Sequence, residues 1–232
     1  MSARRPRVAI DGPAGAGKST IARALAERLG FVLVDTGALY RTVALAAKRQ
    51  GVDWEDDPAV GRVAERLVAD RGIALERGDG GAVRVLLGGE DVSLAIRAPV
   101  MSLGASRVSA VPAVRAALLD MQRQAGAGGG VILEGRDIGT VVFPDAEVKF
   151  FLTASPEIRA RRRHDELCAR GTDVGYDETL ADVIRRDKQD TERPVAPLRQ
   201  AEDARLVDSS GRDVADLVEE MARVVEDRMR RP

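Results

Sequence analysis

An α/β fold, with a five-stranded parallel sheet covered by helices on both faces, is what this sequence predicts. Short apolar segments with β-branched residues alternate with segments whose apolar residues recur at helical spacing. A glycine-rich stretch at residues 12–19 directly follows the first apolar segment. Strands that alternate with helices in this way build parallel sheets that are buried on both faces.

The expected core strands lie at residues 8–10, 31–34, 131–133, 148–152 and 205–208. Helices are expected over residues 21–29, 37–47, 59–70, 99–108, 112–124, 156–170, 178–190 and from 214 onward. Thr36, Ser155, Asp177 and Asp213 each precede such a segment, and their side-chain oxygens suit the N-cap position. These signals predict where the helices begin.

A small antiparallel insert interrupts the alternation of strands and helices. Strand-like runs at residues 73–76, 82–87 and 90–92 are separated by glycine turns at 78–81 and 88–89. Such spacing predicts β-hairpins.

The composition excludes several kinds of site. The chain has 232 residues, 44% of them hydrophobic, and a net charge of −1, so no global field draws it to nucleic acid or membranes. Cys168 and His164 are the only residues of their kinds, which speaks against a disulfide, a Cys- or His-based metal cage and a Ser-His-Asp triad. No apolar run approaches the length of a membrane span. We therefore expect a cytoplasmic monomer that binds neither nucleic acid nor membranes.

Residues 12–19 fit the phosphate-binding pattern G-x-x-x-x-G-K-[ST], although only four of the 36 basic residues are lysines. Glycines let backbone N–H groups wrap a phosphate, Lys18 reaches the β- and γ-phosphates, and Ser19 ligates Mg²⁺. Glu134 closes the third core strand, where its carboxylate can hold Mg²⁺ through water. The predicted ATP-binding residues are Gly12, Pro13, Ala14, Gly15, Ala16, Gly17, Lys18, Ser19 and Thr20.

Arginines mark the acceptor side. In a doubly wound sheet, ligands bind outside the carboxyl ends of the strands, so Arg41 and Arg136 are expected at one crevice with Arg193 nearby. Guanidinium groups recognise phosphate well. An alcohol acceptor benefits from a positioned base, whereas a phosphate acceptor needs only clamping, and the absence of a crevice histidine fits phosphate better.

A helical lid is predicted over about residues 158–190. Arg159, Arg162 and Arg163 share one helix face, and a glycine-bounded stretch at 171–175 follows their helix. Packed against a triphosphate, such arginines would neutralise the charge that builds up during transfer. The predicted catalytic residues are Lys18, Arg136, Arg159 and Arg163.

Four motifs together resemble bacterial cytidylate kinases over essentially the whole chain. They are DGPAGAGKST (11–20), DTGALYR (35–41), EGRDIGTVVFPDA (134–146) and RPVAPL (193–198). The resemblance implies a P-loop kinase that phosphorylates CMP and dCMP with ATP and Mg²⁺. It also implies a core at about 1–35, 125–157 and 191–232, and an acceptor-binding region with the β insert at about 36–124.

The resemblance assigns the acceptor residues by motif position. Arg41, Arg136 and Arg193 resemble the clamp on the acceptor phosphate, and Thr36 belongs to the same side. Residues that resemble the cytosine-reading group are Ser106, Arg115 and Asp137, and those that resemble the ribose pair are Arg186 and Asp190. This chain has Glu134 where Asp is frequent and Thr36 where Ser is frequent; both keep the chemistry.

Two other functions compete with this interpretation. A small-alcohol P-loop kinase of the shikimate or gluconate type would use Asp35 near the acceptor hydroxyl, but it does not explain the β insert or Gly135-Arg136-Asp137. A non-catalytic nucleotide switch would need a partner surface, and the complete arginine set argues against it.

Overall fold

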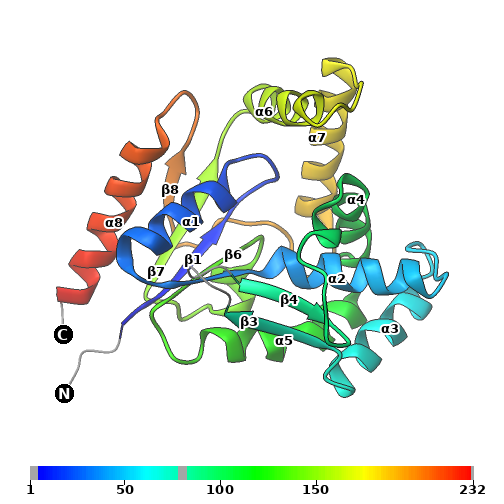
Figure 1. Cartoon of the computed structure of the whole chain (residues 1–232). Coiled ribbons are helices and arrows are strands. Elements are labelled where there is room, and N and C mark those ends of the chain that lie inside the picture. The colour runs from blue at the N-terminus through cyan, green and yellow to red at the C-terminus, as the bar shows by residue number, and fades with distance from the viewer. Residues whose placement is uncertain (1–4, 78–82, 231–232) are drawn as a thin grey trace. The chain divides into compact units, whose positions relative to one another are not determined.

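The computed structural model describes residues 5–77 and 83–230, which form two compact units (Figure 1). The first unit comprises Met1–Val32 and Gly129–Pro232, and the second comprises Leu33–Gly128. Strand β2 (Val32–Asp35) contains the point at which the chain passes from the first unit to the second.

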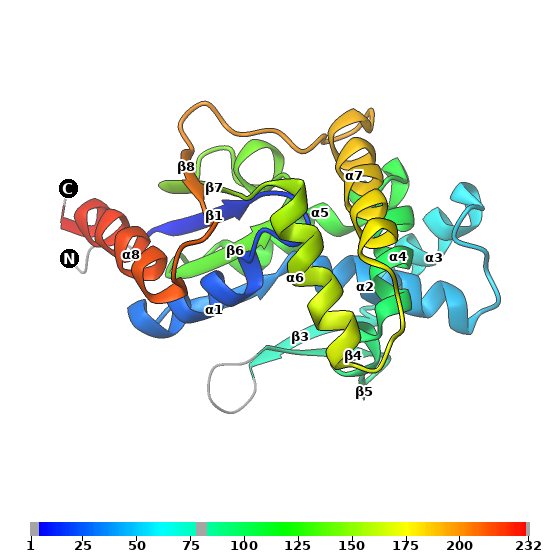
Figure 2. The same cartoon turned by 90° about the horizontal axis from the view of Figure 1, so that it is seen from above.

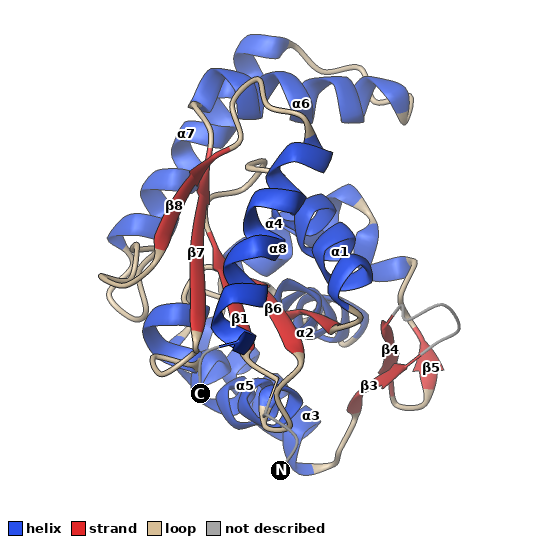
Figure 3. Cartoon of the chain, turned by 90° about the vertical axis from the view of Figure 1, so that its left-hand side faces the viewer, coloured by secondary structure: helices blue, strands red, loops and turns tan. Residues whose placement is uncertain are grey.

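The main sheet has five strands in the order β2-β6-β1-β7-β8 (Figure 3). Besides β2, its strands are β1 (Arg7–Asp11), β6 (Val131–Gly135), β7 (Val148–Thr153) and β8 (Arg205–Asp208). The pairs β1–β6, β1–β7 and β7–β8 are parallel. Val8, Ala9 and Ile10 in the central strand are fully buried, which explains their unbroken apolar run. The predicted parallel α/β fold class is confirmed.

Four helices belong to the first unit: α1 (Lys18–Leu29), α6 (Pro156–Ala169), α7 (Tyr176–Glu192) and α8 (Val214–Arg230). Helix α1 packs against α8, and α6 packs against α7 as a helical hairpin over the segment predicted to be the lid (Figure 2). A short π-turn, η3 (Ile138–Val142), follows β6.

The predicted caps in this unit were partly right. The hydroxyl of Ser155 accepts from the backbone N–H of Ile158 at 3.3 Å, and Asp213 accepts from Ala215 at 2.7 Å. The cap predicted at Asp177 was wrong, because α7 begins before Asp177 and Gly175 is its N-cap. Asp177 lies in the first turn, where a negative charge still suits the positive end of the helix.

The second unit holds the antiparallel insert and four helices. The insert consists of β3 (Ile73–Arg77), β4 (Val83–Leu87) and β5 (Glu90–Asp91), paired antiparallel in that order as predicted. The predicted turn at residues 78–81 lies outside the described residues. The helices are α2 (Thr36–Arg49), α3 (Asp57–Ala69), α4 (Pro99–Val108) and α5 (Pro112–Gly126), with a 3-10 turn, η2 (Ala95–Arg97), before α4.

Thr36 was predicted to cap α2, and this was wrong. Asp35 is the N-cap, since its carboxylate accepts from the backbone N–H of Ala38 at 3.2 Å, and Thr36 is already helical. An ionised carboxylate at this position also complements the helix dipole.

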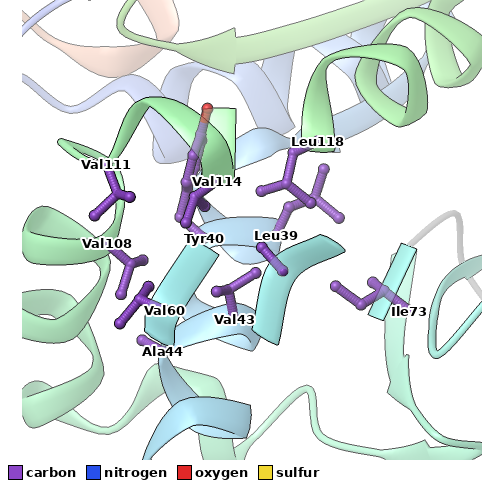
Figure 4. Close-up of a cluster of buried hydrophobic side chains, with 11 residues drawn as sticks. Leu39, Tyr40, Val43, Ala44, Val60, Ile73, Val108, Val111, Val114 and Leu118 are labelled. Carbon is purple, nitrogen blue, oxygen red and sulfur yellow. The ribbon is translucent and has the colours of Figure 1, made fainter. Parts of the chain in front are cut away.

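An apolar core joins the helices of the second unit to β3 (Figure 4). Its buried members are Leu39, Tyr40, Val43, Ala44, Val60, Ala64, Ile73, Val108, Val111, Val114 and Leu118. Members from α2, α3 and α5 recur at helical spacing, so one stripe of each of these helices faces this core, while α4 contributes Val108. The insert is thereby tied to the helices through Ile73.

Helix α4 approaches α2 closely at Gly104. A Cβ atom placed there would lie 2.7 Å from Cζ2 of Trp54 and 2.9 Å from the Cβ of Ala44. Trp54 cannot move freely, because its indole N–H donates to the carbonyl of Ala44 at 2.9 Å. Glycine at this position is therefore a packing requirement.

Among the described residues, no helix combines the length and the apolar character that crossing a membrane requires.

We predict that Gly104→Ala lowers the free energy of unfolding by about 1–3 kcal/mol, because the added methyl group overpacks the contact with Trp54. The sign is diagnostic, since alanine is otherwise the better helix former by about 1 kcal/mol. Denaturant unfolding followed by circular dichroism measures the change. Gly128→Ala is the control, because a Cβ there meets nothing within 4 Å. A Gly104→Ala protein as stable as wild type would contradict the packing argument.

Candidate active site

The phosphate loop connects β1 to α1. A Cβ at Gly12, whose φ is +150°, would lie 2.0 Å from the carbonyl oxygen of Leu152, so the turn admits only glycine. Gly17 is left-handed, with a φ of 89°, and is the N-cap of α1. Glycine brings no side chain to cap the helix, and the loop opens onto the positive end of the helix. All nine predicted ATP-binding residues lie in this loop and the first helical turn.

Lys18 is buried at the base of the loop. Its ammonium group donates to the carbonyl of Pro13 at 2.7 Å, and only 7% of the residue is exposed. Burial lowers the pKa of Lys18 to about 7, and the positive charge of Arg136 acts in the same direction against the attraction of Glu134. The lysine is thus held where an added negative charge would favour its protonated form.

The predicted metal ligands lie together. The hydroxyl of Ser19 donates to the carboxylate of Glu134 at 2.9 Å, and Glu134 is 4% exposed. A hydroxyl and one carboxylate are the hard oxygen donors from which Mg²⁺ sites are built, with phosphate and water supplying the rest. The described residues contain no group of three or more His, Cys, Asp or Glu side chains that could hold a metal ion by itself. These two residues fit a magnesium ion that is held mainly by a nucleotide.

Arg159 joins the lid hairpin to the phosphate loop. Its guanidinium donates to the carbonyl of Ala14 at 3.1 Å and to the carboxylate of Asp187 in α7 at 2.9 Å, and its Nε donates to Ala154 at 2.9 Å. The residue is 3% exposed. A Cβ at Gly15 would lie 3.1 Å from the Cβ of Arg159, so the loop glycine also permits this close approach.

The other two lid arginines have different partners. Arg162 donates to the hydroxyl of Ser209 at 3.1 Å and to its carbonyl at 2.7 Å. Ser209 in turn donates to the carbonyl of Ala16 at 2.9 Å, which anchors the phosphate loop. Arg163 instead pairs with Glu166 on its own helix at 3.2 Å. The three arginines predicted to share one helix face therefore have separate partners, which are Asp187 for Arg159, Ser209 for Arg162 and Glu166 for Arg163.

A buried cluster of opposite charges follows β6. Arg136 donates to Asp190 at 2.9 Å, and the guanidinium of Arg193 lies 3.9 Å from Asp190 and 3.8 Å from Asp137. Burial tends to raise the pKa of Asp190, but the charges of Arg136, Arg193 and Arg186, with the hydrogen bond from Arg136, together hold that pKa below its usual value. Burial and the nearby positive charge of Arg136 lower the pKa of Arg186. The Nε of Arg186 has no hydrogen-bond partner within the described part of the chain. The first unit thus brings together five of the predicted acceptor residues.

The remaining acceptor residues belong to the second unit. Arg41 forms an ion pair with Asp35, and its buried Nε has no hydrogen-bond partner among the described residues. Both residues line a pocket whose other walls are Ala38, Leu75, Val83, Val85, Ser93, Ile96 and Arg97. The pocket thus lies between the start of α2, the insert and η2. Thr36 is buried in the same helical turn.

Arg115 and Ser106 lie on α5 and α4 of this unit. Arg115 donates to the carbonyl of Ser109 at 3.2 Å, and its guanidinium lies 5.4 Å from the ring centre of Tyr40. The carbonyl of Ser106 accepts from the hydroxyl of Ser109 at 3.1 Å. The base-reading role of both residues is still a prediction.

Sequence reasoning did not predict the contacts of four side chains whose hydrogen bonds position other residues of the site. They are Asp11, which bonds to the turn after Asp137; Asp35, which caps α2; Asp187, the partner of Arg159; and Ser209, the anchor of the loop. Asp11 and Ser209 lie at carboxyl ends of strands, which is the one signal that could have marked them. No local pattern marks Asp187, which is one of several acidic residues on an amphipathic helix.

Comparison with known proteins identifies the family. A cytidylate kinase from Geobacter sp. (strain M21) is 54% identical over 222 residues, which cover 96% of this chain and 93% of that protein. Another cytidylate kinase, from Syntrophotalea carbinolica, is 54% identical over 221 residues, or 95% of this chain and 92% of that protein.

Among solved structures, an uncharacterized protein from Eubacterium ventriosum has the same fold. Its TM-score is 0.54 at 13% identity, and the match covers 96% of this chain and 99% of that one. A sequence profile described as cytidylate kinase matches residues 8–227. Since that match spans nearly the whole chain, this protein belongs to the cytidylate kinase family.

Proposed function

We propose that this protein transfers the γ-phosphoryl group of ATP to CMP and dCMP, giving CDP and dCDP. The observation that supports this best is the register of two neighbouring strands. Asp11, the last residue of β1, pairs with Gly135, the last residue of β6. The phosphate loop and the Arg136-Asp137 pair therefore begin side by side, so a donor and an acceptor of phosphate can meet at one edge of the sheet.

The donor side is built for a triphosphate. Backbone N–H groups of the loop and the start of α1 bind the phosphates, and Lys18 adds a positive charge. Ser19 and Glu134 are the residues that would hold Mg²⁺, directly and through water respectively. When bound, the ion supplies positive charge to the β- and γ-phosphate oxygens.

On the acceptor side, Arg136 and Arg193 of the first unit and Arg41 of the second are proposed to bind the CMP phosphate. Thr36 is proposed to bind the same nucleotide. An oxygen of that phosphate attacks the γ-phosphorus as the bond to the β–γ bridging oxygen breaks, and ADP leaves. No base is needed, because the attacking oxygen is already anionic.

Base and sugar recognition is proposed for a separate group of residues. Asp137 can accept a hydrogen bond from the exocyclic amine of cytosine, with Ser106 and Arg115 completing the reader, and Arg186 and Asp190 bind the ribose. Uracil would present a carbonyl to Asp137, which leaves two acceptors facing each other in a buried site.

Charge neutralisation is assigned to Lys18, Arg136, Arg159 and Arg163. Arg159 already contacts the phosphate loop at Ala14, which supports its place beside the triphosphate. Arg159 now pairs with Asp187 and Arg163 with Glu166, and we propose that each exchanges this carboxylate for phosphate oxygens. We propose that α6 and α7 act as the lid in this exchange, and that the protein acts as a cytoplasmic monomer.

A coupled assay with ATP and Mg²⁺ tests this function against its rivals. We expect turnover with CMP and dCMP and at most weak turnover with UMP, AMP or shikimate, because uracil has a carbonyl where cytosine has its amine, adenine carries its amine on a larger two-ring base, and shikimate has no base. Turnover of shikimate without a nucleotide acceptor would favour the small-alcohol kinase. Slow ATP hydrolysis with no acceptor turnover would favour the nucleotide switch.

Arg136→Ala is expected to lower kcat/KM for CMP by about 100-fold or more, since one donor aimed at developing charge is commonly worth that much. The dissociation constant of ATP should change little, because the loop and its helix remain. Steady-state kinetics and calorimetric binding measure the two effects. Arg185→Ala is the matched control, since Arg185 pairs with Asp182 at the surface of the same unit. Unchanged CMP kinetics in Arg136→Ala would exclude the clamp.

The pKa of Lys18 predicts that ATP binding takes up a proton. At a pKa of about 7, most Lys18 is neutral at pH 8 and protonated at pH 6. Triphosphate favours the charged form, so Mg-ATP affinity should be about tenfold lower at pH 8 than at pH 6. Titration calorimetry at pH 8, in buffers of different ionisation enthalpy, should show an uptake approaching one proton. Lys18→Arg stays charged and should show none; uptake of the same size in that variant would contradict the assignment.

A further inference from the structure

A carboxylate outside the predicted site lies beneath the base-reading turn. Asp11 is the last residue of β1, directly before the phosphate loop, and it is 4% exposed. Its two carboxylate oxygens accept separate hydrogen bonds, from the backbone N–H of Ile138 at 2.8 Å and from that of Gly139 at 2.7 Å. One side chain thus satisfies two successive backbone donors of a neighbouring segment.

Those two donors are the first N–H groups of the π-turn η3, whose N-cap is Asp137. The turn bonds back to Asp137, because the N–H groups of Val141 and Val142 both donate to the Asp137 carbonyl, at 2.9 and 3.2 Å. No side-chain cap comes from Asp137 itself. Asp11 therefore supplies from another strand the capping that a turn of this kind otherwise lacks.

The bond to Ile138 fixes the peptide plane that directly follows Asp137. This plane sets the direction of the Cα–Cβ bond of Asp137, while the guanidinium of Arg193 lies 3.8 Å from its carboxylate on the other side. Asp137 is 5% exposed, so its side chain has little room to reorient. The backbone of Asp137 is thus held by Asp11, and its carboxylate, which is proposed to bind cytosine, is held by Arg193.

Keeping Asp11 charged in this place is costly. Burial raises the pKa of Asp11 to about 6, and the negative charge of Asp137 adds to the rise, while the two backbone N–H groups oppose it. A neutral residue would avoid that cost. The chain nevertheless places here the one kind of side chain that accepts two hydrogen bonds with two equivalent oxygens.

From this geometry we propose that Asp11 is a positioning residue for base choice. Its bidentate bond to the Ile138 and Gly139 amides holds Asp137 in the orientation that accepts the exocyclic amine of cytosine. The inference rests on the proposed function, because it needs Asp137 to contact the base. It adds a residue that touches neither nucleotide and acts through the turn.

Asp11→Asn tests the proposal with almost no change in volume. The Asn oxygen keeps one bond, but its amide group then faces the second backbone N–H, so donor meets donor. We expect the ratio of kcat/KM for CMP to that for UMP to fall about tenfold, mainly through loss on CMP, since small misplacement of a reading group is enough for this. In the Asp137→Ala background, the same substitution should change the ratio less than about twofold, because the residue through which Asp11 acts is gone.

Glu147→Gln is the matched control. Glu147 accepts a hydrogen bond from the backbone N–H of Arg7, at the opposite end of β1, at 2.8 Å. Like Asp11 it is a carboxylate bonded to a backbone amide, but it lies away from the base-reading turn. This variant should lose stability without altering the CMP to UMP ratio. Equal losses on CMP and UMP in Asp11→Asn would overturn the proposal and leave Asp11 as a fold-stabilising cap. An equal fall of the ratio with and without Asp137 would overturn it as well.

Gly139→Ala provides a second route if Asp11→Asn is recovered unfolded. A Cβ at Gly139 would lie 3.1 Å from Cδ of Lys149, whose ammonium group is held by Pro144 and Asp203, so the added methyl group displaces the backbone that carries the N–H bonded to Asp11. The ratio should fall again, and an unchanged ratio would overturn the proposal. Failure of the proposed function is seen separately, as absence of CMP turnover in the wild-type protein.

Discussion

The parallel pairing of β1 with β6 is the constraint on which the site depends. Backbone hydrogen bonds align Asp11 with Gly135, and Ile10 with Glu134. Side chains alternate between the faces of a strand, so a slip of one residue would turn Glu134 away from Ser19. The same slip would separate Asp11 from the amides of η3. The apolar residues of both strands hold this register, and the chemistry at their ends follows from it.

Buried residues of opposite charge in the first unit stabilise one another. Lys18, Glu134, Asp137, Asp190 and Arg193 are each at most 8% exposed. Burying a charge is costly unless partners surround it, so removing one member leaves the others uncompensated. Effects of substitutions within this group should therefore not add, because each residue is part of the environment of the next.

Local patterns in the sequence were sufficient for most of the fold and for the phosphate loop. The loop is contiguous, and glycine at position 12 is required by a close contact with the backbone of Leu152. Strands such as 131–133 were visible because they are buried on both faces and hence apolar throughout. Helix α1 begins at Lys18, three residues before the start expected from its apolar spacing.

Partner choice was less predictable, because it depends on which side chains the fold brings together. Asp35 rather than Thr36 caps α2, since two adjacent residues both suited the position and only the backbone decides between them. The arginines of α6 looked equivalent on one helix face, yet Arg159 lies buried against Asp187 and Ala14. No local pattern marks Asp187, and the position of Ser209 after a strand indicates a place at the sheet edge but does not identify its partners. The roles of the acceptor residues are inferred from motif resemblance. The contacts among Arg136, Asp190 and Arg193 are consistent with those roles.

The single tryptophan of the chain belongs to the second unit, where it rests on Gly104 and donates to Ala44. Its indole emission consequently reports on the environment of α2 and α4, and the first unit contributes no such fluorophore of its own. A spectroscopist who follows this protein by tryptophan fluorescence observes the half that carries Arg41 and Arg115. Changes at the phosphate loop leave the tryptophan fluorescence unaltered unless they also change the surroundings of Trp54.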